Sequence, residues 1–277
     1  GRDCWHGKCT FCAWTTTYPK FRARDPENVL DEIGHLIDNY QVKEIMDDTG
    51  AFPPGKWLRK FCNGMIERGY NKKVLLDCNM RFGALSFDDY KLMKKAGFRL
   101  LLFGLESANQ NTLDKVDKKL TREEIIDSCK LARKAGIYPH ITIMFGYPWE
   151  SYDDACKTLE LGKYLLKKGI AYTVQATIVI PYPGTPLFKE CKENGLLKTL
   201  DWSRYDMREP VMKSSIPNDK IQKLVQGIYN VSLNPKFLMR RVLSVRDFND
   251  VAYFARAGSK VLGHLLDFKP REKSVKQ

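Results

Sequence analysis

The chain has 277 residues, 43% of them hydrophobic, and its 46 Lys or Arg against 33 Asp or Glu give a formal net charge of +13. This length can bury one large core, so a single α/β barrel is as acceptable as two ordinary domains. No apolar run reaches the length of a membrane span and no signal peptide is recognisable, so we expect a cytoplasmic protein.

The first element along the chain is a cysteine-rich loop, in which Cys4, Cys9 and Cys12 lie within nine residues. Thiolates this close can bind one inorganic centre, and a four-iron cluster held by three of them keeps one iron free for another ligand. A Cys-x-x-Cys pair with a third cysteine and the neighbouring His6 is also the pattern of a zinc site. The loop alone leaves both centres open, with the cluster slightly ahead.

The other five cysteines are scattered singly through periodic segments. They fit reduced, buried thiols better than a disulfide framework, which agrees with a cytoplasmic protein. They are Cys62, Cys78, Cys129, Cys156 and Cys191.

After the loop, amphipathic helical patterns alternate with short β-branched runs. We expect helices at 26–40, 55–69, 86–96, 121–135, 151–168 and 183–194, and strands at 42–46, 74–79, 99–105, 138–145 and 172–180. Helix starts carry capping signals, such as Thr121 with Glu124, and glycines such as Gly97 end helices before the next strand. Regular alternation with short connections predicts parallel strands in an open or partial barrel.

Polar residues follow most of these strands, at the end where parallel barrels carry their active sites. Any one of them has a local explanation, such as a capped turn or a surface charge. On the last strand Thr173, Gln175 and Thr177 share a face that is more polar than an ordinary barrel core. Taken together, these placements predict a ligand in the mouth of the barrel.

Together with the cysteine loop, these strand ends resemble the radical S-adenosylmethionine (SAM) superfamily, and within it the cobalamin-binding branch. The resemblance covers most of the chain. It is carried by the loop with Thr10-Phe11 between its last two cysteines, the Asp-Asp-Thr-Gly turn at 47–50, Asn-Met-Arg at 79–81, Phe-Gly-Leu-Glu-Ser at 103–107, Gly-Tyr-Pro-Trp-Glu at 146–150 and Pro-Tyr-Pro-Gly-Thr-Pro-Leu-Phe at 181–188.

The resemblance implies a partial (β/α)6 TIM-barrel-like core with a [4Fe-4S] cluster on Cys4, Cys9 and Cys12 that cleaves SAM reductively. It also implies cobalamin-dependent methylation, or related radical chemistry, on a small-molecule or lipid-like substrate, with flavodoxin or ferredoxin as reductant. The implied SAM-binding residues are Phe11 against the adenine, Asp48, Thr49 and Gly50 at the methionine ammonium, Asn79, Arg81, Glu106 and Ser107 at the carboxylate and ribose, and Gly146 and Pro181 around the adenine.

Two departures from the family pattern affect these expectations. Four residues, Trp5 to Lys8, separate the first two cysteines where three are usual, and we expect Gly7 to absorb the extra residue in a bulged loop. The first barrel strand and the N-terminal cobalamin domain of the branch are expected to be missing from this chain, which would leave one sheet edge unpaired.

Beyond residue 200 the pattern becomes helical and basic, so we place a boundary between a barrel at 1–200 and a C-terminal extension at 201–277. Helices are expected at 236–243 and 248–266, and 15 Lys or Arg against 8 Asp or Glu leave an excess of seven positive charges here. A helical cap with a solvated basic face is preferred over peripheral contact with anionic lipid, and nucleic acid is not expected. Two alternatives stay open: a zinc-stabilised nucleic-acid-binding module and a cobalamin-independent radical SAM enzyme such as an RNA methylthiotransferase.

Overall fold

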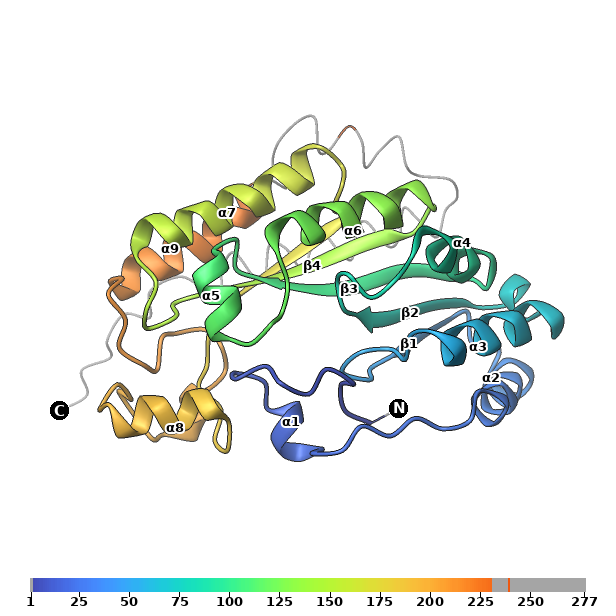
Figure 1. Cartoon of the computed structure of the whole chain (residues 1–277), viewed down its shortest axis with the longest axis horizontal. Helices are drawn as coiled ribbons and strands as arrows, with labels where there is room; N and C mark the ends of the chain where they lie inside the picture. Colours follow the sequence, from blue (N-terminus) through green and yellow to red (C-terminus); the bar gives the residue numbers. More distant parts are fainter. Residues whose placement is uncertain (1, 231–238, 240–277) are drawn as a thin grey trace.

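A computed structural model of the chain describes residues 2–230 and Met239 (Figure 1). Its sheet has five parallel strands in sequential order, each hydrogen-bonded to the next along the chain. They are β1 Glu44–Asp47, β2 Leu75–Met80, β3 Phe98–Glu106, β4 Tyr138–Phe145 and β5 Thr173–Ile178. The expected α/β fold with a parallel, open sheet is confirmed.

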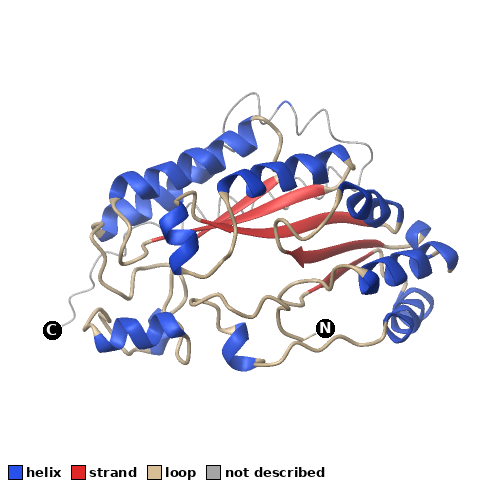
Figure 2. Cartoon of the chain, in the orientation of Figure 1, coloured by secondary structure: helices blue, strands red, loops and turns tan. Residues whose placement is uncertain are grey.

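The longer helices that precede and connect these strands pack on one another and on the sheet. They are α2 Pro26–Tyr40 before β1, α3 Lys56–Glu67, α4 Phe87–Lys95, α6 Arg122–Lys134 and α7 Tyr152–Lys167, with a short 3-10 turn at Tyr70–Lys72. Figure 2 shows α4, α6 and α7 along one side of the strands, whereas the N-terminal loop with α1 (Trp14–Thr17) lies beyond the other side. The N-terminal loop, rather than a layer of helices, therefore lies toward the second side of the sheet.

The predicted helix starts and ends are confirmed by the caps in the structure. Thr121 and Ser151 each form a capping box with the acidic residue three positions later, and Asp25 caps α2 beside Pro26. Gly69, Gly97, Gly136 and Gly169 all have positive φ, as helix-ending glycines require. The sixth helix, α8 Pro186–Glu193, begins three residues later than expected because residues 182–185 form a turn.

Three helices were not expected from periodicity: α1, α5 Gln110–Lys115 and α9 Asn218–Tyr229. The first two are only four and six residues long, too short for a 3.6-residue period to show. Helix α9 packs on α7 and β5, where the Tyr229 hydroxyl donates to Ala176 O (3.3 Å) and accepts from Ala176 N (3.1 Å).

The predicted helices at 236–243 and 248–266 lie outside the described residues, apart from Met239. The boundary at residue 200 stays a prediction. Within the part of the chain that the structure describes, every helix is too short or too polar to span a bilayer.

The two faces of the sheet differ sharply in burial. On β4 the residues that face the helices, Ile141, Ile143 and Phe145, are fully buried, while Tyr138, His140, Thr142 and Met144 alternate with them and are only partly buried. This alternation with a period of two is expected of a strand that has one face in the core and the other face outside it. The core thus lies between the sheet and its helices.

Two leucines on adjacent strands give a matched test of this one-sided core. Leu101 on β3 is fully buried, whereas Leu75 on β2 is 43% exposed on the other face. We expect Leu101→Ala to lower the free energy of unfolding by about 2–5 kcal/mol because it leaves a cavity, and Leu75→Ala to lower it by less than about 1 kcal/mol. Urea unfolding followed by circular dichroism measures both, and equal losses would contradict the arrangement.

His140 on β4 makes the stability of the fold depend on pH. Its Nδ1 lies 2.8 Å from Thr173 Oγ1, its Nε2 is buried without a partner, and burial lowers the pKa of the imidazole to about 4. Between about pH 6.5 and pH 4 the unfolded chain binds a proton that the folded chain excludes, so stability is lost as the pH falls through this window.

We therefore expect His140→Gln to reduce the loss of unfolding free energy between pH 7 and pH 4.5 by about 2–3 kcal/mol. The exposed His35→Gln on α2 is the matched control. Denaturant titrations of the three proteins at both pH values measure the effect. An identical pH dependence in wild type and His140→Gln would refute it.

Candidate active site

The cysteine loop at residues 4–12 lies against the turn that follows β1. Cys4 forms a parallel bridge with Ala51, and Trp5 Nε1 donates to Phe52 O at 3.2 Å. A Cβ atom on Gly50 would come within 3.1 Å of Cys4 Cβ and 3.2 Å of Cys4 N. Glycine at this position of the predicted turn is thus needed for the close approach of the loop.

A second segment, residues 115–119 at the end of α5 and just after it, also contacts this loop. Thr10 N donates to Val116 O (3.1 Å), and His6 Nε2 lies 2.8 Å from Asp117 O. Because a carbonyl oxygen only accepts, His6 Nε2 carries the proton, and Nδ1 is the ring nitrogen that keeps its lone pair. The loop turns at Gly7, whose φ of +58° is the backbone expected to absorb the additional residue between the first two cysteines.

All three cysteines of the loop line one cavity of about 200 Å³. Their thiols are free, as are those of the other five cysteines. Within residues 2–230 no three His, Cys, Asp or Glu side chains converge as the ligands of a single ion. The cavity is also lined by His6, Phe11, Trp14, Gly50, Ala51, Asn79, Met80, Arg81, Leu102, Phe103, Gly104, Glu106, Lys118 and Thr142.

The structure thus brings together eight of the thirteen residues expected at the site: the three cysteines with Phe11, Gly50, Asn79, Arg81 and Glu106. The other five, Asp48, Thr49, Ser107, Gly146 and Pro181, do not line this cavity. Asp48 and Thr49 still reach it through Asn79, whose Nδ2 donates to Thr49 O (3.0 Å) and Asp48 Oδ1 (3.4 Å).

The thiols of Cys9 and Cys12 are largely shielded from water. Burial raises the pKa of Cys9 to about 11 and also raises that of Cys12, while the positive charge of Lys118 acts in the opposite direction on both. The metal-free thiols of Cys9 and Cys12 are therefore protonated at neutral pH, and binding of a metal centre releases their protons.

A buried ion pair between Lys118 and Glu106 forms one wall of the cavity. Lys118 Nζ lies 2.7 Å from Glu106 Oε1, and the two side chains are only 12% and 8% exposed. Burial is the largest single effect and lowers the pKa of Lys118, but the charge and hydrogen bond of Glu106, together with Cys9, outweigh it, so the pKa is raised. Both charged ends lie directly over Gly104, where any side chain would collide with them.

The sequence did not predict Lys118 as a residue of the site, because it belongs to a loop with no periodic pattern between α5 and α6. Three residues from other parts of the chain contact the segment at 115–119 that contains Lys118. Two of them are His6 and Thr10, described above, and the third is Arg81. The Arg81 guanidinium donates to the carbonyl oxygens of Lys118 and Lys119, the second at 2.7 Å. Arg81 therefore holds Lys118 in place as well as lining the cavity.

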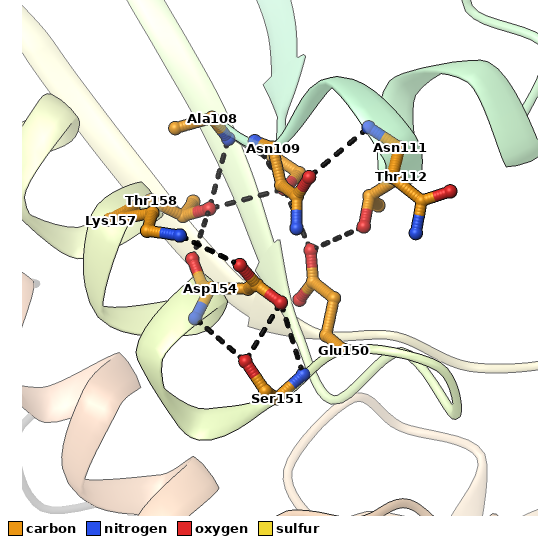
Figure 3. A network of polar contacts seen from close by, with 10 residues as sticks. Ala108, Asn109, Asn111, Thr112, Glu150, Ser151, Asp154, Lys157 and Thr158 are labelled. Atoms are coloured by element: carbon orange, nitrogen blue, oxygen red, sulfur yellow. Dashed lines mark hydrogen bonds and ion pairs between the residues drawn. The ribbon is translucent and has the colours of Figure 1, made fainter.

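Behind this wall a buried polar network anchors the end of β3. Ser107 Oγ and Thr112 Oγ1 each donate to Glu150 Oε1 at 2.7 Å, and Ala108 N donates to Thr158 Oγ1 at 2.9 Å (Figure 3). Burial raises the pKa of Glu150. Ser107 is fully buried in this network, so it acts on the cavity only through its neighbour Glu106.

Glu106 itself has a φ of +61°, an uncommon backbone for a residue with a side chain. Ser107 N donates to Leu105 O across this residue at 2.8 Å. The twisted strand end, held from behind by Glu150, directs the Glu106 carboxylate at Lys118.

We expect removal of one partner of the Lys118–Glu106 pair to lower the free energy of unfolding much more than removal of both. Lys118→Met leaves a buried carboxylate without its counterion and should lower the free energy of unfolding by about 3–5 kcal/mol, whereas the double variant with Glu106→Gln should recover most of that loss. Urea unfolding of the wild type, both single variants and the double variant completes the cycle. Additive losses would show that the pair does not couple.

Comparison with known proteins agrees with this geometry. A model of the Radical SAM superfamily matches residues 1–162. The chain is 29% identical over 260 residues to an uncharacterized methyltransferase of Pyrococcus horikoshii, covering 87% of this chain and 52% of that protein. It is 30% identical over 208 residues to an anaerobic magnesium-protoporphyrin IX monomethyl ester cyclase of Cereibacter sphaeroides, covering 74% of this chain and 33% of the cyclase.

Among solved structures, the cobalamin-dependent S-adenosylmethionine radical enzyme OxsB, with aqua-cobalamin and S-adenosylmethionine bound, shares the fold. It superposes with a TM-score of 0.65 over 94% of this chain and 45% of OxsB, at 14% identity. The chain thus spans about half or less of the length of these relatives. Since the family model covers more than half of its residues, the chain belongs to the radical SAM superfamily.

Proposed function

We propose that this chain is the catalytic core of a radical SAM methyltransferase that works with cobalamin. The observation that carries the proposal is the cavity at the carboxyl ends of parallel strands, which the three loop thiols share with the buried Lys118–Glu106 pair. The similarity to a methyltransferase of Pyrococcus horikoshii supports methyl transfer, and the fold shared with OxsB supports the use of cobalamin.

The donor set of the loop fits a [4Fe-4S] cluster. Cys4, Cys9 and Cys12 supply three free thiols from one short loop, and three thiolates leave one iron of such a cluster open for SAM. When bound, the cluster supplies the electron that splits SAM into methionine and a 5′-deoxyadenosyl radical.

The residues of this chain would hold SAM by charge and shape. Lys118 and Arg81 are the cations of the cavity wall and suit the SAM carboxylate, while Glu106 and Asn79 present acceptor and donor groups to the ribose. The turn at Asp48, Thr49 and Gly50 would receive the methionine ammonium. Phe11 would pack on the adenine, with the backbone at Gly146 and Pro181 beyond it.

The protein's contribution to the reaction is placement and exclusion of water, because the cofactors carry the difficult chemistry. Cobalamin would bind to a part of the full-length protein outside this chain. The substrate would be a small molecule or a lipid-like compound, and a flavodoxin- or ferredoxin-type protein would supply electrons. The protein would work in the cytoplasm.

Anaerobic reconstitution with iron and sulfide tests this proposal. We expect the wild type to gain the visible sulfur-to-iron absorption and, when reduced, to release 5′-deoxyadenosine and methionine from SAM. Cys4→Ser, Cys9→Ser and Cys12→Ser should each abolish 5′-deoxyadenosine release because the cluster loses a ligand. Cys156→Ser, on helix α7 and away from the loop, is the matched control and should retain it.

Metal analysis of the same preparations can show the result that would contradict this proposal. A colourless protein that holds one zinc ion and leaves SAM intact would refute the radical SAM assignment of the site and favour a zinc-stabilised binding module.

A further inference from the structure

The face of β4 and β5 that points away from the helices carries a row of mostly polar side chains. The register of the two strands pairs His140 with Thr173, Thr142 with Gln175 and Met144 with Thr177. Barrel interiors are normally filled by branched apolar residues. Five of these six side chains can form hydrogen bonds, so the face is built for something other than packing.

On this face, His140 has a ring nitrogen without a hydrogen-bond partner. Its Nδ1 is engaged with Thr173 Oγ1 at 2.8 Å, but its Nε2 is buried and has no partner. Buried polar atoms are almost always paired, because an unpaired one loses its contacts with water and gains nothing in return. An additional group that bonds to Nε2 would remove this cost.

The row is continuous with the cavity of the cysteine loop. Thr142 lines that cavity, and His140 lies one alternate position further from the carboxyl end of β4 on the same face. Gln175, paired with Thr142, is exposed on β5, the last strand of the described sheet. A ligand could therefore reach Gln175 from solvent and extend one end past Thr142 into the cavity.

The chemistry of the row favours an uncharged ligand group. Its members are three threonine hydroxyls, one amide and an imidazole that burial keeps neutral at physiological pH. The guanidinium of Arg99 on β3 forms ion pairs with Asp77 and Glu44. With no uncommitted cation in the row itself, a carboxylate or phosphate would lack a counterion, whereas a hydroxyl, carbonyl or amide could bond to imidazole, hydroxyl and amide together.

We propose that His140, Thr142 and Gln175 form a subsite that binds a neutral hydrogen-bonding group of the substrate, with His140 Nε2 as its central contact. This inference rests on the proposed function for the identity of the ligand as substrate. The subsite holds the substrate by a part remote from the reacting carbon and so orients that carbon toward the cavity.

Acetamide and acetate are matched probes, because they have the same size and shape and differ in charge. The full-length protein, or the chain as it stands, is labelled with 15N-histidine, and the side-chain signals of its four histidines are recorded. The His140→Gln variant identifies the His140 signals. We expect acetamide to shift the His140 signals saturably and acetate to leave them unchanged at equal concentration, with the exposed His35 signals as internal control.

Thr142→Val and Gln175→Ala should each weaken the binding of acetamide by about threefold to tenfold, the effect of one lost hydrogen bond. Thr142→Ser retains the hydroxyl and should bind acetamide as the wild type does. A purely structural role for these residues would leave the acetamide affinity of all three variants equal. That equality, or a His140 shift that is the same with acetate, would overturn the subsite.

The titration requires neither cluster nor SAM, so its result is separate from the test of the proposed function. Saturable acetamide binding in a protein that fails to cleave SAM would overturn the assignment of the ligand as a radical substrate. Absence of acetamide binding in a protein that cleaves SAM would overturn the subsite alone.

Discussion

The buried ion pair between Lys118 and Glu106 is the interaction on which the cavity depends. It joins the end of β3 to the segment at 115–119, and that segment holds the cysteine loop through Thr10 and His6. Two charges this deeply buried are stable only as a pair. The pair therefore couples the position of the strand end to the position of the loop that carries the three thiols.

The residues around the ion pair restrict the positions that Glu106 and Lys118 can adopt. The unusual backbone of Glu106 is held by Ser107, which is bonded to Glu150 behind the strand. Lys118 is fixed by the contact of Arg81 with its carbonyl oxygen, and Gly104 provides the space for both charged ends. Because these contacts come from several elements, a change in one of them should alter the whole cavity wall.

The one-sided core explains why a ligand site is possible at all. Helices bury one face of the sheet in apolar contacts, so the other face is free to carry Asn79, Arg81, Glu106 and the row that begins at His140. The polar side chains of this face meet the cysteine loop only because parallel strands bring their carboxyl ends to one edge. Stability and chemistry are thereby assigned to opposite faces of the same strands.

The sequence by itself determined the order and type of the main elements, since hydrophobic period, capping boxes and helix-ending glycines are local properties; α2 and β4 have the expected bounds. It also identified the three cysteines and five further lining residues. Only the tertiary structure revealed Lys118, the burial of Ser107 and the unpaired Nε2 of His140, because each depends on atoms brought together from distant segments, and no local pattern encodes such contacts.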